Sequence, residues 1–242
     1  MMKYFKRTTL LCFSPPVMIA TIVIELSLAA WVLTRYALGT SRRIILAILI
    51  CLAAFQLAEY NVCSPALPDI IWSRIGYVFI TMLPALGIHL ITRLRREERT
   101  VLLSSTYSAA TLFAVAFAFL PTSLNHGVCA GNYVIFRLSQ PLASIYGYYY
   151  LGFVAFGLAL ALMPAKKAST SGKAALRWTS WGYVAFTVPT LIINFLLPMT
   201  RLGIPSIMCG FAVILAIILS LKVAPLADDD VRITSSAVSH RA

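Results

Sequence analysis

Apolar residues fall into seven long stretches that are separated by short polar breaks. A helix that crosses the hydrocarbon core of a bilayer needs roughly 20 apolar residues, and each stretch is about that long. Because backbone groups in lipid must be satisfied within their own segment, such a stretch predicts a helix. We therefore predict an all-α integral membrane protein with seven transmembrane helices, at Phe13–Thr34, Ile44–Tyr60, Trp72–Ile91, Val101–Leu120, Pro141–Met163, Trp178–Leu197 and Ile204–Leu221.

The composition agrees with this prediction and sets the domain organisation. Of 242 residues, 60% are hydrophobic and 12% are charged, whereas a soluble domain carries about 25% charged residues. Seven spans leave short loops and no room for a second soluble domain. We expect a short external N-terminal tail over 1–12, a membrane domain over 13–221, and a disordered, polar cytoplasmic tail over 222–242.

The basic residues predict the orientation. Positive residues concentrate in cytoplasmic loops, so the side with more of them faces the cytoplasm. The richer side has Arg35, Arg42, Arg43, Arg93, Arg95, Arg96, Arg99, Lys166, Lys167, Lys173, Arg177, Lys222, Arg232 and Arg241, and the other side has Lys3, Lys6, Arg7, Arg74, Arg137 and Arg201. We expect a multi-pass protein of a prokaryotic plasma membrane, with the N-terminus outside and the C-terminus in the cytoplasm. Lys3, Lys6 and Arg7 alternatively suggest a signal peptide, but no small-residue cleavage site follows them.

The net charge of +12 does not indicate a nucleic-acid partner, because the basic residues lie in the breaks between apolar stretches. Two of these basic segments, Arg93–Arg99 and Lys166–Arg177, are expected to be cytoplasmic loops. Each is a possible docking site for a cytoplasmic protein. The Arg93–Arg99 turn could also contact anionic lipid.

Three ionisable residues fall inside predicted spans, where such groups are costly and usually face the protein interior. Glu25 lies near the middle of the first span and shares a helix face with Thr21 and Ala29. It is either a proton-accepting or ligand-binding carboxylate, or a protonated side chain that is bonded to a neighbouring helix. His89 either reaches Glu25 as a proton-sensitive pair or extends toward the headgroups beside Arg93.

Glu59 lies near the outer end of the second span, on one face with Gln56 and Cys63. Arg74 begins the third span at a similar depth. One interpretation is an interfacial Glu59–Arg74 ion pair, and the other is an outward-facing ligand pocket formed by Gln56, Glu59 and Arg74.

Two further stripes lie toward the outer half of their helices under this orientation. They are polar on the sixth span and aromatic on the fifth, and both are compatible with interhelical packing or with an externally open pocket. Their members are Tyr183, Thr187, Thr190 and Asn194, and Tyr146, Tyr149, Tyr150 and Phe153. Pro84 and Pro189 remove backbone donors in mid-span and should kink the third and sixth helices.

Cys63 and Cys129 both fall in loops on the external side, where disulfides persist. They either form a bridge between two loops or remain unrelated thiols. Cys51 and Cys209 lie within spans and are expected to pack as small apolar residues.

Several membrane-protein classes are excluded by missing residues. The seventh span has no internal lysine for a retinal Schiff base, and three histidines are too few for a seven-helix zinc hydrolase. No nucleophile–base pair, His-Glu-x-x-His motif or phosphate-binding loop is present. We therefore expect no cofactor, no metal and no enzymatic activity.

The segment Trp72-Ser-Arg-Ile-Gly-Tyr77, followed by Leu83-Pro84-Ala-Leu-Gly-Ile-His89, resembles the seven-helix sensor region at the N-terminus of some bacterial histidine kinases. Similar stretches occur in uncharacterised prokaryotic membrane proteins. The resemblance covers Phe13 to Met163 and implies a sensory role, although no output domain follows the last helix. The leading prediction is a sensor that binds a small or lipophilic ligand and signals to a cytoplasmic partner. A proton-coupled transporter is the second prediction and a membrane-embedded enzyme the third.

Overall fold

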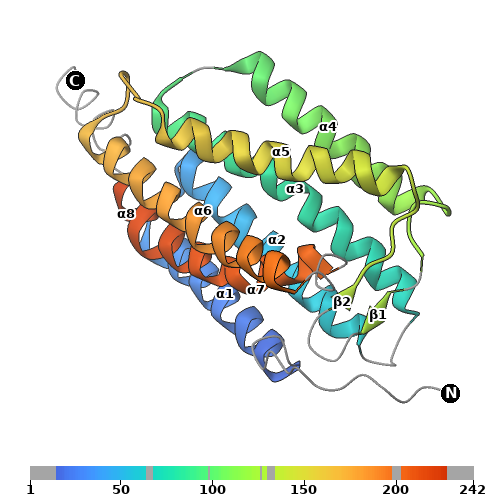
Figure 1. Cartoon of the computed structure of the whole chain (residues 1–242). Coiled ribbons are helices and arrows are strands. Elements are labelled where there is room, and N and C mark those ends of the chain that lie inside the picture. The colour runs from blue at the N-terminus through green and yellow to red at the C-terminus, as the bar shows by residue number, and fades with distance from the viewer. Residues whose placement is uncertain are drawn as a thin grey trace, which may run out of the picture.

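The computed structural model in Figure 1 describes residues 15–63, 68–97, 99–125, 127–129, 134–197 and 203–227. Within these residues, seven helices are long and apolar enough to cross a membrane, which confirms the predicted all-helical architecture and the number of long apolar helices. They are α1 (Pro15–Arg35), α2 (Thr40–Val62), α3 (Asp69–Arg95), α4 (Thr100–Phe119), α5 (Leu142–Leu162), α6 (Thr170–Leu196) and α7 (Ile204–Ile218). A π-helical turn, η3 (Leu219–Val223), and a short α8 (Ala224–Leu226) continue α7. The predicted N-terminal tail at 1–12 and residues 228–242 of the predicted C-terminal tail lie outside the described residues. The prediction of disorder was wrong for the first part of the C-terminal tail, because residues 222–226 continue the last helix in η3 and α8.

Helix α3 is the central helix of the bundle and contacts α2, α4, α5 and α6. Helix α1 packs on α2 and α7, while α4 lies at the opposite edge of the bundle against α3 (Figure 1). A two-stranded antiparallel hairpin, β1 (Val128–Cys129) and β2 (Val134–Ile135), lies between α4 and α5 in the chain. We call the end of the bundle that carries this hairpin the hairpin end.

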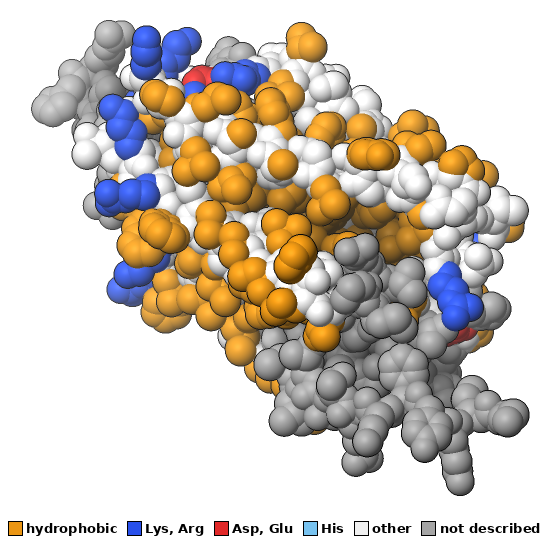
Figure 2. All heavy atoms as spheres, in the orientation of Figure 1, with side chains coloured by type: hydrophobic (Ala, Val, Ile, Leu, Met, Phe, Trp, Pro, Cys, Tyr) orange, Lys and Arg blue, Asp and Glu red, His pale blue; other side chains and the backbone are white. Residues whose placement is uncertain are grey.

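The opposite end contains the connections α1–α2, α3–α4 and α5–α6, together with the end of α8 (Figure 1). Lysine and arginine side chains gather at this end, whereas hydrophobic side chains cover the flank between the two ends (Figure 2). We call it the basic end. The fold therefore places the predicted charge-rich breaks together, as helices of alternating direction require.

Helices α2 and α6 begin earlier than the hydropathy pattern predicts. Helix α6 starts at Thr170, about two turns before the predicted Trp178. Ser169 is its N-cap, and the Ser169 Oγ accepts a hydrogen bond from the Gly172 amide at 3.0 Å. The prediction that Lys166–Arg177 is a loop was therefore wrong for its second half, because a capped helix can extend beyond an apolar stretch when its long basic side chains are exposed.

Three arginines bind the carbonyl ends of other helices. Arg74 donates to the carbonyls of Ala118 at 2.9 Å and of Phe117 and Leu120 at 3.3 Å, at the end of α4. Arg95 donates to those of Leu160 at 2.6 Å, Met163 at 2.8 Å and Pro164 at 3.2 Å, at the end of α5. Arg42 donates to the carbonyls of Ala224 and Ala37. The last carbonyls of a helix lack intrahelical partners and carry partial negative charge, so these guanidinium groups hold helix ends together.

The turn between α3 and α4 is ordered by ionic contacts. Arg96 adopts a left-handed conformation with φ of 55° and ends α3. Glu97 then bridges Arg95 Nη2 at 2.8 Å and Arg99 Nη2 at 2.7 Å. The hydrogen bond from Arg95 is the main reason that the pKa of Glu97 lies below its ordinary value. Of the predicted Arg93–Arg99 turn, Arg93 to Arg95 therefore belong to α3, and the described residues that follow are tied to the helix end by ionic contacts.

Gly172 supplies a test of helix packing at the basic end. A Cβ at Gly172 would lie 2.9 Å from the backbone oxygen of Leu94, so Gly172→Ala should lower the free energy of unfolding by about 1–3 kcal/mol. Gly152→Ala is the matched control, because a Cβ there meets nothing within 4 Å and alanine favours a helix by about 0.5–1 kcal/mol. Denaturation in mixed detergent micelles measures both, and equal effects would contradict the close contact.

Candidate functional site

Two glutamates lie in the interior between α1 and α2. Glu25 is 0% exposed and Glu59 is 1% exposed, and their carboxyl groups interact electrostatically. Both oxygens of Glu25 and Oε1 of Glu59 are buried without a hydrogen-bond partner in the described structure. A native protein leaves few buried polar atoms unsatisfied, so three on one carboxyl pair require an explanation.

Helix α7 supplies the polar neighbours of this pair. Ser206 is buried, and its hydroxyl donates a hydrogen bond to Glu59. The same Ser206 Oγ accepts a hydrogen bond from the Val134 amide of β2 at 3.2 Å. The Cys209 thiol is buried one turn further along α7, within electrostatic range of both carboxyl groups. The Ser206 hydroxyl therefore connects the hairpin to the buried Glu59.

The predicted helix face of Glu25 is the face that packs inward. Thr21, Glu25 and Ala29 are all buried, and the Thr21 hydroxyl bonds to the Met18 carbonyl of its own helix. Gln56 is buried as well, one turn before Glu59 on α2.

Arg74 does not pair with Glu59. Its guanidinium binds the carbonyls at the end of α4, as described above, and no ion pair to either buried glutamate joins residues that the structure describes. The predicted Glu59–Arg74 pair is therefore not formed, whereas the predicted pocket of Gln56, Glu59 and Arg74 stays a prediction. The α4 end presents several carbonyl acceptors, and a planar guanidinium binds more than one of them at once.

His89 contacts α4 rather than α1. Its Nδ1 lies 2.9 Å from the Tyr107 hydroxyl oxygen, and the two rings meet edge to face at 5.7 Å. The predicted Glu25–His89 pair is not formed, because both Glu25 oxygens lack a partner among the described residues. His89 is half-buried and lines a cavity near Arg93 at the basic end, which agrees with the alternative that it extends toward the headgroups.

A cavity of about 660 Å³ opens near the hairpin, and we call it the hairpin-end cavity. Its volume is in the range that small-molecule sites occupy. Helices α3, α5 and α7 and the β2 segment supply its walls. Aromatic and apolar groups line the interior, and Asn125, Arg137 and Gln140 are exposed polar groups among its lining. The larger lining side chains include Tyr77, Phe136, Tyr146, Tyr150 and Met208.

The two predicted stripes divide between this cavity and helix packing. Tyr146 and Tyr150 line the hairpin-end cavity, whereas the Tyr149 hydroxyl donates to the Thr81 carbonyl at 2.7 Å. This bond ties α5 to α3 three residues before Pro84, and the rings of the stripe also pack against Tyr77, Phe113 and Phe117.

The polar stripe of α6 serves mainly its own helix. Thr187 and Thr190 donate to the carbonyls of Tyr183 at 2.6 Å and Phe186 at 2.7 Å, so the proton of each hydroxyl is used within α6. Tyr183 lines a small interior cavity of about 40 Å³, where its hydroxyl abuts Gly87. Asn194 is buried in the same helix.

The hairpin-end cavity and the carboxyl pair share the first turns of α7. Ile204, Pro205 and Met208 line the cavity, and Ser206 between them bonds to Glu59. Tyr77 also lines the cavity and lies within electrostatic range of Glu59. Ser206 and Cys209 were missing from the sequence-based list of site residues. Their spacing of three in an otherwise apolar span was a signal that could have identified them.

The predicted Cys63–Cys129 bridge stays a prediction, because the Cys129 side chain lies outside what the structure describes. The backbones of the two loops do approach one another. A Cβ at Gly127 would lie 2.8 Å from Val62 Cγ1, which places β1 beside the end of α2. Cys51 and Cys209 are buried free thiols, as expected for cysteines within spans.

No protein-family model and no curated protein sequence matches this chain.

Proposed function

We propose that this protein is an integral membrane sensor that binds a small or lipophilic ligand in the hairpin-end cavity. The Glu25–Glu59 pair is the responding element, and the α3–α4 turn at Arg93–Arg99 contacts a cytoplasmic partner. In this proposal the hairpin end faces outward and the basic end faces the cytoplasm, in agreement with the positive-inside rule. The resemblance to the seven-helix sensor region of histidine kinases supports the same role.

The observation that carries this proposal is the incomplete hydrogen bonding of the buried carboxyl pair. An ionised carboxylate without a partner is costly in a membrane interior, so two such charges side by side require at least one bound proton. A group that is unsatisfied in one state can be satisfied in another. A ligand that binds more tightly to the state in which the carboxyl pair has its hydrogen-bond partners would shift the protein toward that state.

Helix α3 provides a path from the cavity to the basic end. Tyr77 and Ile80 line the hairpin-end cavity, and Arg95 at the other end of the same helix holds the α3–α4 turn. Pro84 lies between them and interrupts the helical hydrogen bonds. A change in the bend at Pro84 would therefore move the Arg93–Arg99 turn relative to α5.

A side chain placed in the cavity tests this proposal without a known ligand. Gly147 lines the hairpin-end cavity and has open space around its Cα, so Gly147→Trp should imitate an occupied cavity. We expect it to change the amide hydrogen exchange of the α3–α4 turn by at least about fivefold in nanodiscs, the low end of typical coupling between sites. Adding Glu25→Gln should abolish the change, whereas Asp69→Asn should leave it in place.

Gly152→Trp is the matched control, because Gly152 has equally open surroundings but does not line the cavity. If Gly147→Trp and Gly152→Trp have the same effect on the turn, occupancy of the cavity is not relayed. If the change persists in the Gly147→Trp/Glu25→Gln double variant, the carboxyl pair is not the responding element.

A proton-coupled transporter is the second candidate, because a pair of buried carboxyl groups within the helix bundle could carry protons. Neither the hairpin-end cavity nor the small interior cavity is lined by Glu25 or Glu59, which favours sensing. Proteoliposomes loaded with a pH-sensitive dye distinguish the two. Transport predicts a proton flux that falls in Glu25→Gln, whereas sensing predicts no flux above that of empty liposomes.

A further inference from the structure

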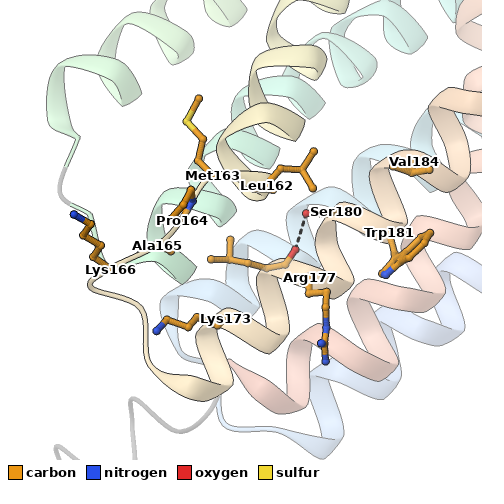
Figure 3. A pocket seen from close by; sticks show the side chains of 12 residues that line it. Leu162, Met163, Pro164, Ala165, Lys166, Lys173, Arg177, Ser180, Trp181 and Val184 are labelled. Atoms are coloured by element: carbon orange, nitrogen blue, oxygen red, sulfur yellow. Dashed lines mark hydrogen bonds between the residues drawn. The ribbon is translucent and has the colours of Figure 1, made fainter.

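A groove of about 580 Å³ lies at the basic end, between the end of α5 and the first turns of α6 (Figure 3). We call it the α5–α6 groove. Lys166 comes from the loop after α5, and Lys173 and Arg177 come from successive turns of α6. Trp181 and Val184 continue the lining further along α6, away from the basic end.

The basic side chains of this groove have no acidic partner among the residues that the structure describes. Lys166, Lys173 and Arg177 are exposed and have no ion pair or hydrogen bond to another residue in the described part of the chain. The sequence contains no aspartate or glutamate between residues 100 and 227, so no acidic side chain of this region can neutralise them. Three cations around one groove favour an anionic occupant.

The remainder of the lining is apolar and lies within the spanning part of the helices. Leu162 is 66% exposed and Trp181 is 60% exposed, so both present apolar surface on the outside of the bundle. The Ser180 hydroxyl donates to the Leu176 carbonyl at 3.0 Å and is therefore not directed to a ligand (Figure 3). An occupant that matches the whole groove needs an anionic group at one end and a hydrocarbon chain at the other.

We propose that the α5–α6 groove is a binding site for an anionic phospholipid. The phosphate binds between Lys166, Lys173 and Arg177, and an acyl chain lies along Leu162, Trp181 and Val184. Basic pockets between transmembrane helices recognise anionic headgroups in this way. The site is independent of the hairpin-end cavity and of the proposed sensory role.

The groove is held in shape before a lipid arrives. Arg95 binds the carbonyls of Met163 and Pro164, which form one wall of the groove. Gly172 packs directly against the Leu94 backbone and fixes the start of α6 against α3. A preformed site loses little conformational entropy when it binds, which favours a specific lipid over a diffuse annulus.

Tryptophan fluorescence provides a direct test, because Trp181 lines the groove. The full chain with Trp31→Phe, Trp72→Phe and Trp178→Phe retains Trp181 as its one tryptophan. In phosphatidylcholine bilayers we expect phosphatidylglycerol with brominated acyl chains to quench Trp181 with at least about fivefold higher apparent affinity than brominated phosphatidylcholine, the ratio that corresponds to about 1 kcal/mol from a single basic residue near an anionic lipid. Equal quenching by the two lipids would overturn the proposal.

Two variants separate the groove from the general charge of the basic end. In that background, the triple variant Lys166→Gln/Lys173→Gln/Arg177→Gln should remove the preference for phosphatidylglycerol. The control triple variant Arg35→Gln/Arg43→Gln/Arg93→Gln loses the same charge at exposed positions of the same end and should retain it. If both variants lose the preference equally, the lipid responds to surface charge and the groove is not a site.

Two further measurements test the apolar half of the site. Val184→Trp fills the groove, so in native mass spectrometry it should reduce the phosphatidylglycerol that remains bound to the full chain. Leu191→Trp, at an exposed position of α6 outside the groove, should not. Inorganic phosphate at millimolar concentration should leave Trp181 quenching unchanged; displacement of the lipid by phosphate would instead indicate a site for free anions.

Discussion

Replacing Arg95 with alanine should lower the free energy of unfolding by about 3–5 kcal/mol, the range measured when one partner of a buried charged network is removed. Arg95 is 4% exposed and holds the carbonyls of Leu160, Met163 and Pro164 as well as the Glu97 carboxylate. Truncation leaves the buried Leu160 carbonyl without its donor and breaks the contacts to the other acceptors, and a buried acceptor without a partner costs about 1–3 kcal/mol before relaxation. Unfolding in mixed detergent micelles measures the loss.

Arg93→Ala is the matched control, because it removes the same charge from an exposed position on the same turn of α3. Surface substitutions of this kind usually change stability by less than about 0.5 kcal/mol. Arg95→Lys should fall between the two variants, since an ammonium group cannot reproduce the planar donors of guanidinium. A loss in Arg95→Ala no larger than that in Arg93→Ala would show that Arg95 does not hold α5 to α3.

Replacing Glu25 with methionine should have the opposite sign and raise the free energy of unfolding by about 1–3 kcal/mol, the usual desolvation penalty of an unsatisfied buried group. Glu25 is entirely buried, and neither of its carboxyl oxygens has a hydrogen-bond partner within the described structure. Methionine is similar in length and fills irregular space in a core without polar atoms. The same denaturation assay measures the gain.

Glu59→Met provides the internal comparison. It also removes a buried carboxyl group, but it takes away the acceptor of the Ser206 hydroxyl, so its gain should be smaller than that of Glu25→Met. A loss of stability in Glu25→Met greater than about 1 kcal/mol would mean that the carboxyl group has a stabilising partner. The Glu25→Met variant can be tested for both properties. If it is more stable and also no longer changes the exchange of the α3–α4 turn when the cavity is filled, the Glu25 carboxyl group serves function at a cost in stability, as expected at functional sites.

The number and positions of the helices could be predicted from the sequence because a bilayer imposes one length and one kind of secondary structure on each span. The inward face of α1 was predictable for a similar reason. Thr21, Glu25 and Ala29 recur at helical spacing, and a carboxyl group at that depth has to face protein.

The partners of the polar residues were not predictable in the same way. Arg74 was expected beside Glu59 because the two residues lie at similar depths, but depth does not determine which helix is adjacent in the bundle. Arg74 reaches α4 and His89 reaches Tyr107, whereas Glu59 contacts Ser206 of α7, which is distant in sequence. These contacts depend on how helices pack side by side, and periodicity within one helix carries no information about that packing.

The start of α6 shows a different limit. A hydropathy window locates the hydrocarbon core, and α6 extends beyond the core by the turns that carry Lys173 and Arg177. Backbone hydrogen bonding does not depend on hydropathy, so α6 begins at its N-cap, Ser169, and not where the apolar stretch begins.

Two arginines of the basic end, Arg42 and Arg95, are buried and do not contribute to the charged surface of that end. Arg42 and Arg95 are two of the basic residues on which the predicted orientation rests. Once the bundle has closed, Arg42 is 1% exposed and Arg95 is 4% exposed, and their donors point at carbonyl groups of neighbouring helices. The charge exposed to an ion or a lipid at this end is therefore carried by fewer basic side chains than the sequence places there, because Arg42 and Arg95 are used inside the bundle.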